Sequence, residues 1–310
     1  MHDIGEVSGG RRWYSRWGIM RRREKHVVFN PTANKGRAAS RRTEISRSLA
    51  GSGEVIWHVT KERGHAARIT SGLPEDALVV AAGGDGTVHE VAAACVGTGR
   101  TMGILPVGSG NDYVKALGVG GHLRRALEVL KAGKVWAVDA GEVNGIYFNN
   151  GLGIGFDAEV AAGVAEAPRY LGGFGGYLWS VGRLLWGFGC HEATLKLDGK
   201  RVEARTILVA AALGTTYGAR FKLAPEARLD DGMFDVIWSD DINRAEVLRL
   251  IPAALNGTLL RNPKVHVARA REVEIEMAEE VPAHVDGEIL SPTRIFRARA
   301  LPGALRVVAP

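Results

Sequence analysis

The chain has 310 residues, of which 46% are hydrophobic and 24% charged, a composition typical of a soluble globular protein long enough for two domains. Two cysteines, Cys95 and Cys190, are too few for a disulfide framework and predict a reduced, cytosolic protein. Residues 1–20 lack the apolar region of a signal peptide, and the most apolar stretch, residues 170–189, contains several glycines and Arg183, which argues against a membrane-spanning helix.

Positive charge is concentrated at the N-terminus. Residues 1–25 hold seven Arg and Lys residues against three acidic residues, which is +4 of the total net charge of +6. Trp13, Tyr14 and Trp17 lie among the arginines, and this mixture suits an anionic membrane surface. A disordered tail and a start codon placed too early are the alternatives. Because the rest of the chain contributes only +2 and carries no nucleic-acid-reading motif, we predict no nucleic-acid partner.

The first half of the chain alternates between strand-like and helix-like segments. Its apolar runs are followed by breaks such as Asn30-Pro31 or by glycine turns, and then by helical stretches. This alternation predicts a parallel sheet with helices on both faces, whose turns meet beyond the carboxyl ends of the strands. The strand–turn–helix units are expected at residues 27–49, 53–73, 77–96 and 101–119.

After about residue 139 the sequence changes character. The segment "TLKLDGKRVEA" predicts a hairpin around Asp198-Gly199, and "VEIEM" alternates so that Val273, Ile275 and Met277 share one face. The second half is therefore predicted to be mostly antiparallel β, with helical interruptions near residues 158–186 and 243–258.

The segment "GGDGTVHEV" is the clearest candidate for a functional turn. Gly83 and Gly84 permit a close backbone approach, and the spacing of Thr87 and Glu90 predicts a capping box with a helix start near Thr87. A helix N-terminus in a glycine turn is a favourable place for phosphate. Asp85 would repel phosphate, so it is expected to act through Mg²⁺, orient an acceptor hydroxyl, or hold the loop by hydrogen bonds. An ordinary turn between a strand and a helix is the alternative.

Two further turns should lie beside this one. "NPTANKG" supplies backbone donors and Lys35 near a helix start, and "PVGSGND" supplies a second glycine turn that includes Ser109, Asn111 and Asp112. No Walker-type phosphate loop and no dinucleotide-binding fingerprint is present.

These motifs, together with "LDDGMFDV" and "VDGE", resemble those of the diacylglycerol kinase catalytic-domain family in order and spacing, over residues 25–310. The resemblance is strongest to its soluble bacterial lipid kinases, and sphingosine and ceramide kinases are relatives. It implies an ATP- and Mg²⁺-dependent transfer of phosphate to a lipid hydroxyl at the membrane surface by a cytoplasmic enzyme that associates peripherally with the membrane. A homodimer is left open. An NAD kinase-like enzyme, which also carries a GGDG turn, and a catalytically silent nucleotide- or lipid-binding protein are the rival interpretations.

The resemblance also implies roles for individual residues on the nucleotide side. Thr60 would lie near the phosphates of ATP, and Ser109 would face the nucleotide in place of the threonine frequent in the family. His89 replaces a frequent asparagine and is expected on a helix surface. The nucleotide-binding set implied by the resemblance is Asn30, Pro31, Lys35, Gly36, Thr60, Gly83, Gly84, Asp85, Gly86, Thr87, Glu90, Ser109, Asn111 and Asp112.

On the acceptor side, the resemblance implies that the "VDGE" motif supplies the acid that activates the acceptor hydroxyl. Glu288 is favoured over Asp286, with Asp85 as the third catalytic candidate, and a two-residue hairpin turn at Asp286-Gly287 is the structural alternative. The segment "RLDDGMFD" resembles the family's Mg²⁺ site, with Asp231 as a side-chain ligand and carbonyl groups from Arg228 and Met233, or else it is a tight turn.

The fold predicted from the sequence and the resemblance is a Rossmann-like α/β domain with a parallel sheet, followed by a mostly antiparallel β-sandwich domain. The predicted boundaries place a basic extension at residues 1–24, the α/β domain at 25–139 and the β-sandwich at 140–291. Residues 292–310 are expected to pack back onto the α/β domain.

Overall fold

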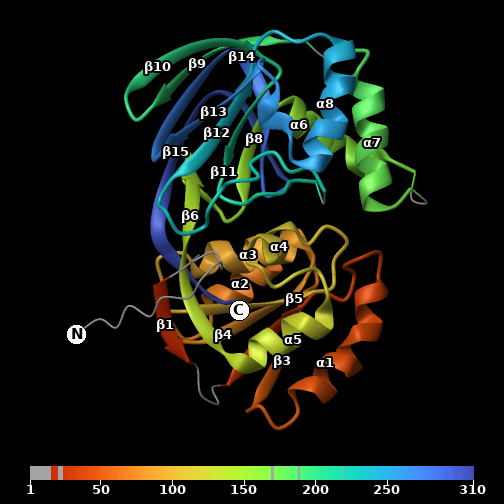
Figure 1. The fold of residues 1–310 in the computed structure, drawn as a ribbon. Coiled ribbons are helices and arrows are strands. Elements are labelled where there is room, and N and C mark those ends of the chain that lie inside the picture. Colours follow the sequence, from red (N-terminus) through yellow and green to blue (C-terminus); the bar gives the residue numbers. More distant parts are fainter. Residues whose placement is uncertain (1–14, 20–23, 169–170, 188, 219) are drawn as a thin grey trace.

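Two domains, one α/β and one rich in antiparallel strands, make up the computed structural model (Figure 1). The structure describes residues 15–19, 24–168, 171–187, 189–218 and 220–310. The predicted fold class is confirmed.

The N-terminal domain is built on a parallel sheet with the strand order β3-β2-β4-β5. Every residue of β2, β4 and β5 is buried, which explains why the apolar residues of these strands are consecutive, as in residues 27–29 of β2, rather than alternating with polar ones. The strands are β2 (Lys25–Phe29), β3 (Val55–Val59), β4 (Leu78–Gly83) and β5 (Thr101–Pro106).

Helices cover both faces of this sheet, as the alternation of segments predicted. Helices α1 and α5 contact each other on one face, and α2 and α3 contact each other on the face that looks toward the second domain (Figure 1). The helical segments are η1 (Arg37–Arg41), α1 (Arg42–Leu49), α2 (His65–Ser71), α3 (Asp85–Cys95), α4 (Asp112–Ala116) and α5 (Leu123–Ala132).

The C-terminal domain consists mainly of antiparallel strands. Val273, Ile275 and Met277 are buried on one face of β14, and the turn at Asp198-Gly199 joins β9 to β10. The strands are β7 (Ile146–Phe148), β8 (Gly151–Gly155), β9 (His191–Leu197), β10 (Lys200–Thr206), β11 (Leu208–Ala212), β12 (Phe234–Ser239), β13 (Val265–Ala270) and β14 (Glu272–Val285).

Helical segments interrupt these strands in the two predicted regions. Helix α8 begins with a capping box in which Asn243 and Glu246 bond each other's backbone N–H groups, and Gly257 ends it in the left-handed conformation. Helices α7 and α8 lie side by side at one end of the domain (Figure 1). The segments are α6 (Phe156–Gly163), η2 (Val164–Glu166), α7 (Gly172–Leu184), α8 (Arg244–Asn256) and η4 (Leu259–Arg261).

Two long strands connect the domains. β6 (Lys134–Val143) and β15 (Glu288–Val308) pair antiparallel with each other, and the predicted border at residue 139 lies inside β6. The first part of β15 pairs with β14, and its last residues pair parallel with β5. One continuous sheet therefore runs through both domains.

Part of the N-terminal extension is built into the fold. β1 (Ser15–Ile19) pairs antiparallel with β6, so this portion is a strand rather than the tail that was one alternative. Trp13, Tyr14 and the arginines at positions 11, 12 and 21–23 lie outside the described residues. Within the described part of the chain, no helix is both long enough and apolar enough to cross a membrane.

Candidate active site

Two adjoining pockets lie at the carboxyl ends of the parallel strands. One is a cavity of about 330 Å³ on the N-terminal domain, and the other is a cavity of about 360 Å³ between that domain and the hairpin that joins β14 to β15. We call them the loop pocket and the cleft pocket. Both pockets are lined by Asp85, Gly86, Ser109 and Glu288.

The loop pocket gathers most, but not all, of the residues predicted to bind nucleotide. Asn30 donates through Nδ2 to Thr87 Oγ1 at 3.1 Å, which joins the first turn to the start of α3. Among the described residues, Pro31, Lys35, Gly36, Gly83 and Asn111 line neither this pocket nor the cleft pocket, and Asp112 lines the cleft pocket alone. The predicted residues that line the loop pocket are Asn30, Thr60, Gly84, Asp85, Gly86, Thr87, Glu90 and Ser109.

The predicted capping box at Thr87 and Glu90 is wrong. Helix α3 begins at Asp85, and Gly84 is its N-cap. Glu90 instead accepts hydrogen bonds from the backbone N–H groups of Gly64 at 2.7 Å and Ala66 at 2.9 Å. The N-terminus of α2 carries unsatisfied N–H groups, and a glutamate on the neighbouring helix satisfies them. Sequence spacing within α3 carries no information about this partner.

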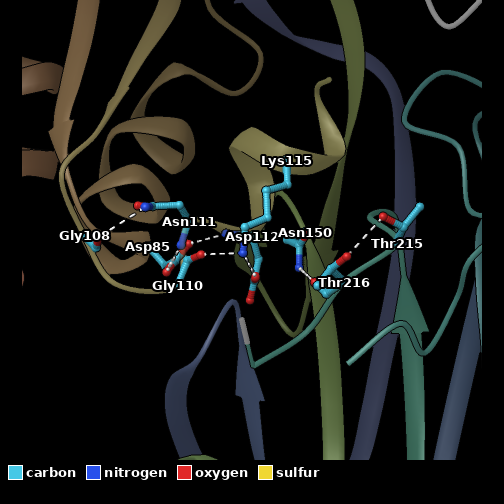
Figure 2. A network of polar contacts seen from close by, with 9 residues as sticks. All are labelled: Asp85, Gly108, Gly110, Asn111, Asp112, Lys115, Asn150, Thr215 and Thr216. Carbon is cyan, nitrogen blue, oxygen red and sulfur yellow. Dashed lines mark hydrogen bonds and ion pairs between the residues drawn. The ribbon is translucent and has the colours of Figure 1, made fainter. Parts of the chain in front are cut away.

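Asp85 fastens the two glycine turns to each other (Figure 2). Its carboxylate accepts the backbone N–H of Asn111 at 2.8 Å and of Asp112 at 2.9 Å. Burial raises the pKa of the Asp85 carboxyl, and these N–H groups offset part of that effect. A side chain at Gly110 would collide with the Asp85 carboxylate. Of the three roles left open for Asp85, the hydrogen bonds that hold the loop are present in the structure.

A lysine and two asparagines continue this polar network. Lys115 donates through Nζ to the Gly110 carbonyl at 2.7 Å, and Asn111 donates to the Gly108 carbonyl at 3.1 Å. Across the cleft, Asn150 donates to the Thr216 carbonyl at 2.9 Å (Figure 2). Two carbonyl groups of the second glycine turn thus accept side-chain donors from α4 and from its N-cap residue.

The "VDGE" segment is both a hairpin turn and part of the cleft pocket. Val285 pairs with Glu288, and the two residues between them have positive φ angles, 52° at Asp286 and 88° at Gly287, as in a two-residue turn of the primed type. The tight turn of the structural alternative is present, and it places both acids at the cleft pocket, so the turn does not exclude a role for them in the site.

Asp286 is buried and heavily bonded. Its carboxylate accepts the backbone N–H groups of Asn149 at 3.0 Å, Asn150 at 2.8 Å and Gly151 at 2.9 Å, and His89 Nδ1 lies 2.8 Å from Oδ2. Burial alone would raise the pKa of Asp286, but His89 and these N–H groups outweigh it and hold the pKa below its usual value. Asp286 thereby joins the hairpin to the turn before β8.

His89 does not lie on the helix surface, contrary to expectation. Its side chain is only 12% exposed, because α3 packs against the hairpin and turns His89 toward Asp286. Burial would lower the pKa of His89, but the bond to Asp286 and the charges of Asp286 and Glu288 raise it. The histidine that replaces the asparagine frequent in the family thus contacts Asp286 of the other domain.

Glu288 differs from the other two candidate acids. Its side chain is 27% exposed and forms an ion pair with Arg63, a residue of the loop before α2. A Cβ atom placed on Gly86 would lie 2.7 Å from Glu288 Oε1, so the carboxylate rests on the glycine turn. Glu288 thus stands at the border between the two pockets.

The cleft pocket also contains a buried group that the motifs did not reveal. Asp157 accepts a hydrogen bond from the Tyr177 hydroxyl at 2.8 Å, and His284 Nε2 lies 2.9 Å from its other oxygen. Burial opposes both charges, but the contact between the two holds the pKa of Asp157 low and that of His284 high. The sequence places His284 only two residues before Asp286, and this closeness to a candidate acid was the available signal for it.

The predicted metal segment lies away from both pockets. Asp231 forms an ion pair with Arg269 and accepts the backbone N–H of Met233 at 3.1 Å, while Arg228 pairs with Asp230. In the described part of the chain, no three or more His, Cys, Asp or Glu residues are grouped to hold a metal ion. Arg269 pairs with the Asp231 carboxylate in this structure, and a Mg²⁺ site made of Asp231 and the carbonyl groups of Arg228 and Met233 stays a prediction.

Known proteins share both halves of this arrangement. The family profile for the diacylglycerol kinase catalytic domain matches residues 24–143, and that for the YegS C-terminal NAD kinase beta sandwich-like domain matches residues 151–309. The site and fold thus define a kinase of the kind that phosphorylates lipids, and the chain belongs to the diacylglycerol kinase family.

Individual relatives are similar over most of their length. A diacylglycerol kinase of Bacillus subtilis is 30% identical over 269 residues, which cover 84% of this chain and 88% of the relative. A diacylglycerol kinase of Staphylococcus carnosus is 29% identical over 273 residues, which cover 86% of this chain and 89% of the relative. The crystal structure of a diacylglycerol kinase from Bacillus anthracis superposes with a TM-score of 0.72 at 23% identity, covers 93% of this chain and 97% of that one, and supports the fold.

Proposed function

We propose that this lipid kinase transfers the γ-phosphate of ATP, supplied as its Mg²⁺ complex, to the hydroxyl group of a diacylglycerol-like lipid. The observation that carries the proposal is the position of Glu288, which lines both the loop pocket and the cleft pocket. A base that removes the proton of the acceptor hydroxyl must stand between the phosphate donor and the acceptor.

The loop pocket has the features of a phosphate-donor site. The backbone of two glycine turns faces it, and the N-terminus of α3 begins at its floor. Asp85 holds the two turns together and so keeps their N–H groups in place for the donor. Mg²⁺ would neutralise charge on the phosphates, as in other phosphoryl transfers.

The cleft pocket has the features of an acceptor site. It adjoins an apolar cavity of about 110 Å³ beneath α6, α7 and α8, and Asp157 and Tyr177 line both spaces. An apolar cavity beside a polar one suits an acceptor with an acyl part and a hydroxyl part. Diacylglycerol is proposed because the Bacillus and Staphylococcus relatives are named for it.

An assay with labelled ATP tests the proposal. The enzyme would be incubated with diacylglycerol, phosphatidylglycerol or a sphingoid base in mixed micelles, and separately with NAD. Label is expected in the organic phase with diacylglycerol, and its transfer is expected to stop when a chelator removes Mg²⁺. Label on NAD, or none on any lipid by a folded protein, would contradict the proposal.

A peripheral membrane contact through residues 1–24 is proposed from their charge and aromatic content. Deleting these residues should weaken binding to anionic vesicles, because each basic residue near such a surface contributes about 1 kcal/mol, and salt should screen the effect. Activity on detergent-solubilised lipid should persist. Deletion of residues 1–14 alone keeps β1 and is the matched control for loss of that strand. Vesicle binding that the longer deletion leaves unchanged, or that is insensitive to salt in the full-length protein, would exclude this contact.

A further inference from the structure

Glu288 and Arg63 come from different domains and meet above the glycine turn. Glu288 is the first residue of β15, and Arg63 belongs to the loop between β3 and α2. Both residues line the loop pocket. The carboxylate of Glu288 also lies close to Gly86, in the first turn of α3.

The groups that hold Glu288 are of the kind that binds phosphate. A guanidinium group binds carboxylates and phosphates with the same pattern of N–H donors, and a helix N-terminus attracts either anion. When a donor phosphate enters the loop pocket, the groups suited to bind it, Arg63 and the start of α3, are therefore already in contact with the Glu288 carboxylate. The two anions compete for Arg63 and for the start of α3.

The strength of the ion pair between Arg63 and Glu288 decides whether a donor phosphate can displace the Glu288 carboxylate from Arg63. The Arg63 side chain is 73% exposed, and ion pairs in such positions contribute little to stability. A phosphate group carries more charge than one carboxylate and accepts more hydrogen bonds. The donor can therefore take Arg63 from Glu288 at small cost.

We infer that Arg63 is a phosphate-binding residue for the donor, and that donor binding transfers Arg63 from Glu288 to the phosphates and leaves the Glu288 carboxylate free for the acceptor hydroxyl. This inference rests on the proposed function, because it takes ATP as the donor. It couples the activation of the base to the presence of the phosphate that is to be transferred.

Binding of ATP and of AMP, followed by calorimetry, tests the exchange without any need for turnover. Arg63→Ala should weaken ATP binding about tenfold or more, since a charge-assisted bond to phosphate is lost, and should change AMP binding by less than about twofold. Arg63→Lys should be intermediate. Arg201→Ala is the matched control, because Arg201 is similarly exposed, with 63% of its side chain accessible, and neither it nor its ion-pair partner Glu203 lines either pocket.

The exchange predicts that a substitution of Glu288 affects ATP binding in the direction opposite to a substitution of Arg63. Glu288→Gln should tighten ATP binding about two- to fivefold, because the competing ion pair is removed. In the Arg63→Ala background the same change should tighten ATP binding clearly less, since there is no arginine to release.

The outcomes separate the inference from the function on which it rests. ATP binding that Arg63→Ala leaves unchanged would overturn the inference alone. Equal tightening by Glu288→Gln in the presence and absence of Arg63 would also overturn it, because plain repulsion between carboxylate and phosphate would then explain the effect. A folded wild-type enzyme that binds no ATP would contradict the proposed function, and the inference with it.

Discussion

Glu288→Gln should reduce phosphoryl transfer to lipid by at least about a hundredfold, the usual scale for the loss of a positioned base. Glutamine keeps the size of the side chain but cannot accept the proton of the acceptor hydroxyl. The loss should appear in kcat, measured with labelled ATP and diacylglycerol micelles, and not as weaker ATP binding, because the donor groups lie on the N-terminal domain.

Asp286→Asn is the companion variant, since two acids flank one glycine. Asp286 accepts three backbone N–H groups and contacts His89, so its replacement should lower the free energy of unfolding by about 1–3 kcal/mol, seen in denaturant titrations. If Glu288→Gln turns over normally and a folded Asp286→Asn does not, Asp286 is the base. If both stay active, the hairpin is structural and Asp85 is the next candidate.

The second large effect is expected for Asp85→Asn, with a fall in phosphoryl transfer of at least about a hundredfold while the overall fold is retained. The Asp85 carboxylate accepts one backbone N–H with each oxygen, and an asparagine amide presents one oxygen and one NH₂ group. The two glycine turns should then separate, and the donor phosphates lose their alignment. Transfer would be measured with labelled ATP, and folding by circular dichroism.

Asp198→Asn is the control for this change. Asp198 also accepts backbone N–H groups, from Arg271 and Glu272, but at a hairpin that lines neither pocket. Its replacement should leave transfer unchanged. Near-normal turnover in a folded Asp85→Asn enzyme would show that the tie between the turns is dispensable for catalysis.

The strands and glycine turns could be predicted because their signals are local. The apolar run before Gly83 marks a buried strand, and "GGDG" marks a turn that must admit a close neighbour. The partners of the polar side chains could not be predicted in the same way. His89 and Glu90 are adjacent on one helix, yet Glu90 bonds the start of α2 and His89 bonds the hairpin 197 residues later. Only the packing of elements distant in sequence decides such contacts.

The resemblance to the family located the acids but did not distinguish their environments. Asp286 and Glu288 are two residues apart, yet one is enclosed by N–H donors and the other is partly exposed beside Arg63. The primed turn causes this difference, because it directs Asp286 back toward β8 and Glu288 onward over Gly86. Asp157 carries no motif at all, since its partners Tyr177 and His284 come from separate segments.

The last residues of β15 determine when the first domain can be completed. Arg306 and Val307 pair with Thr101 and Met102 of β5 on one side and with Ala137 and Trp136 of β6 on the other. A nascent chain that has emerged only as far as β6 lacks the strand between β5 and β6, and its β5 edge is open to association with other chains. The N-terminal domain can therefore complete its sheet only after β15 has been synthesised and has left the ribosome. Transplanting that domain into another protein would require its final strand to be supplied as a separate segment.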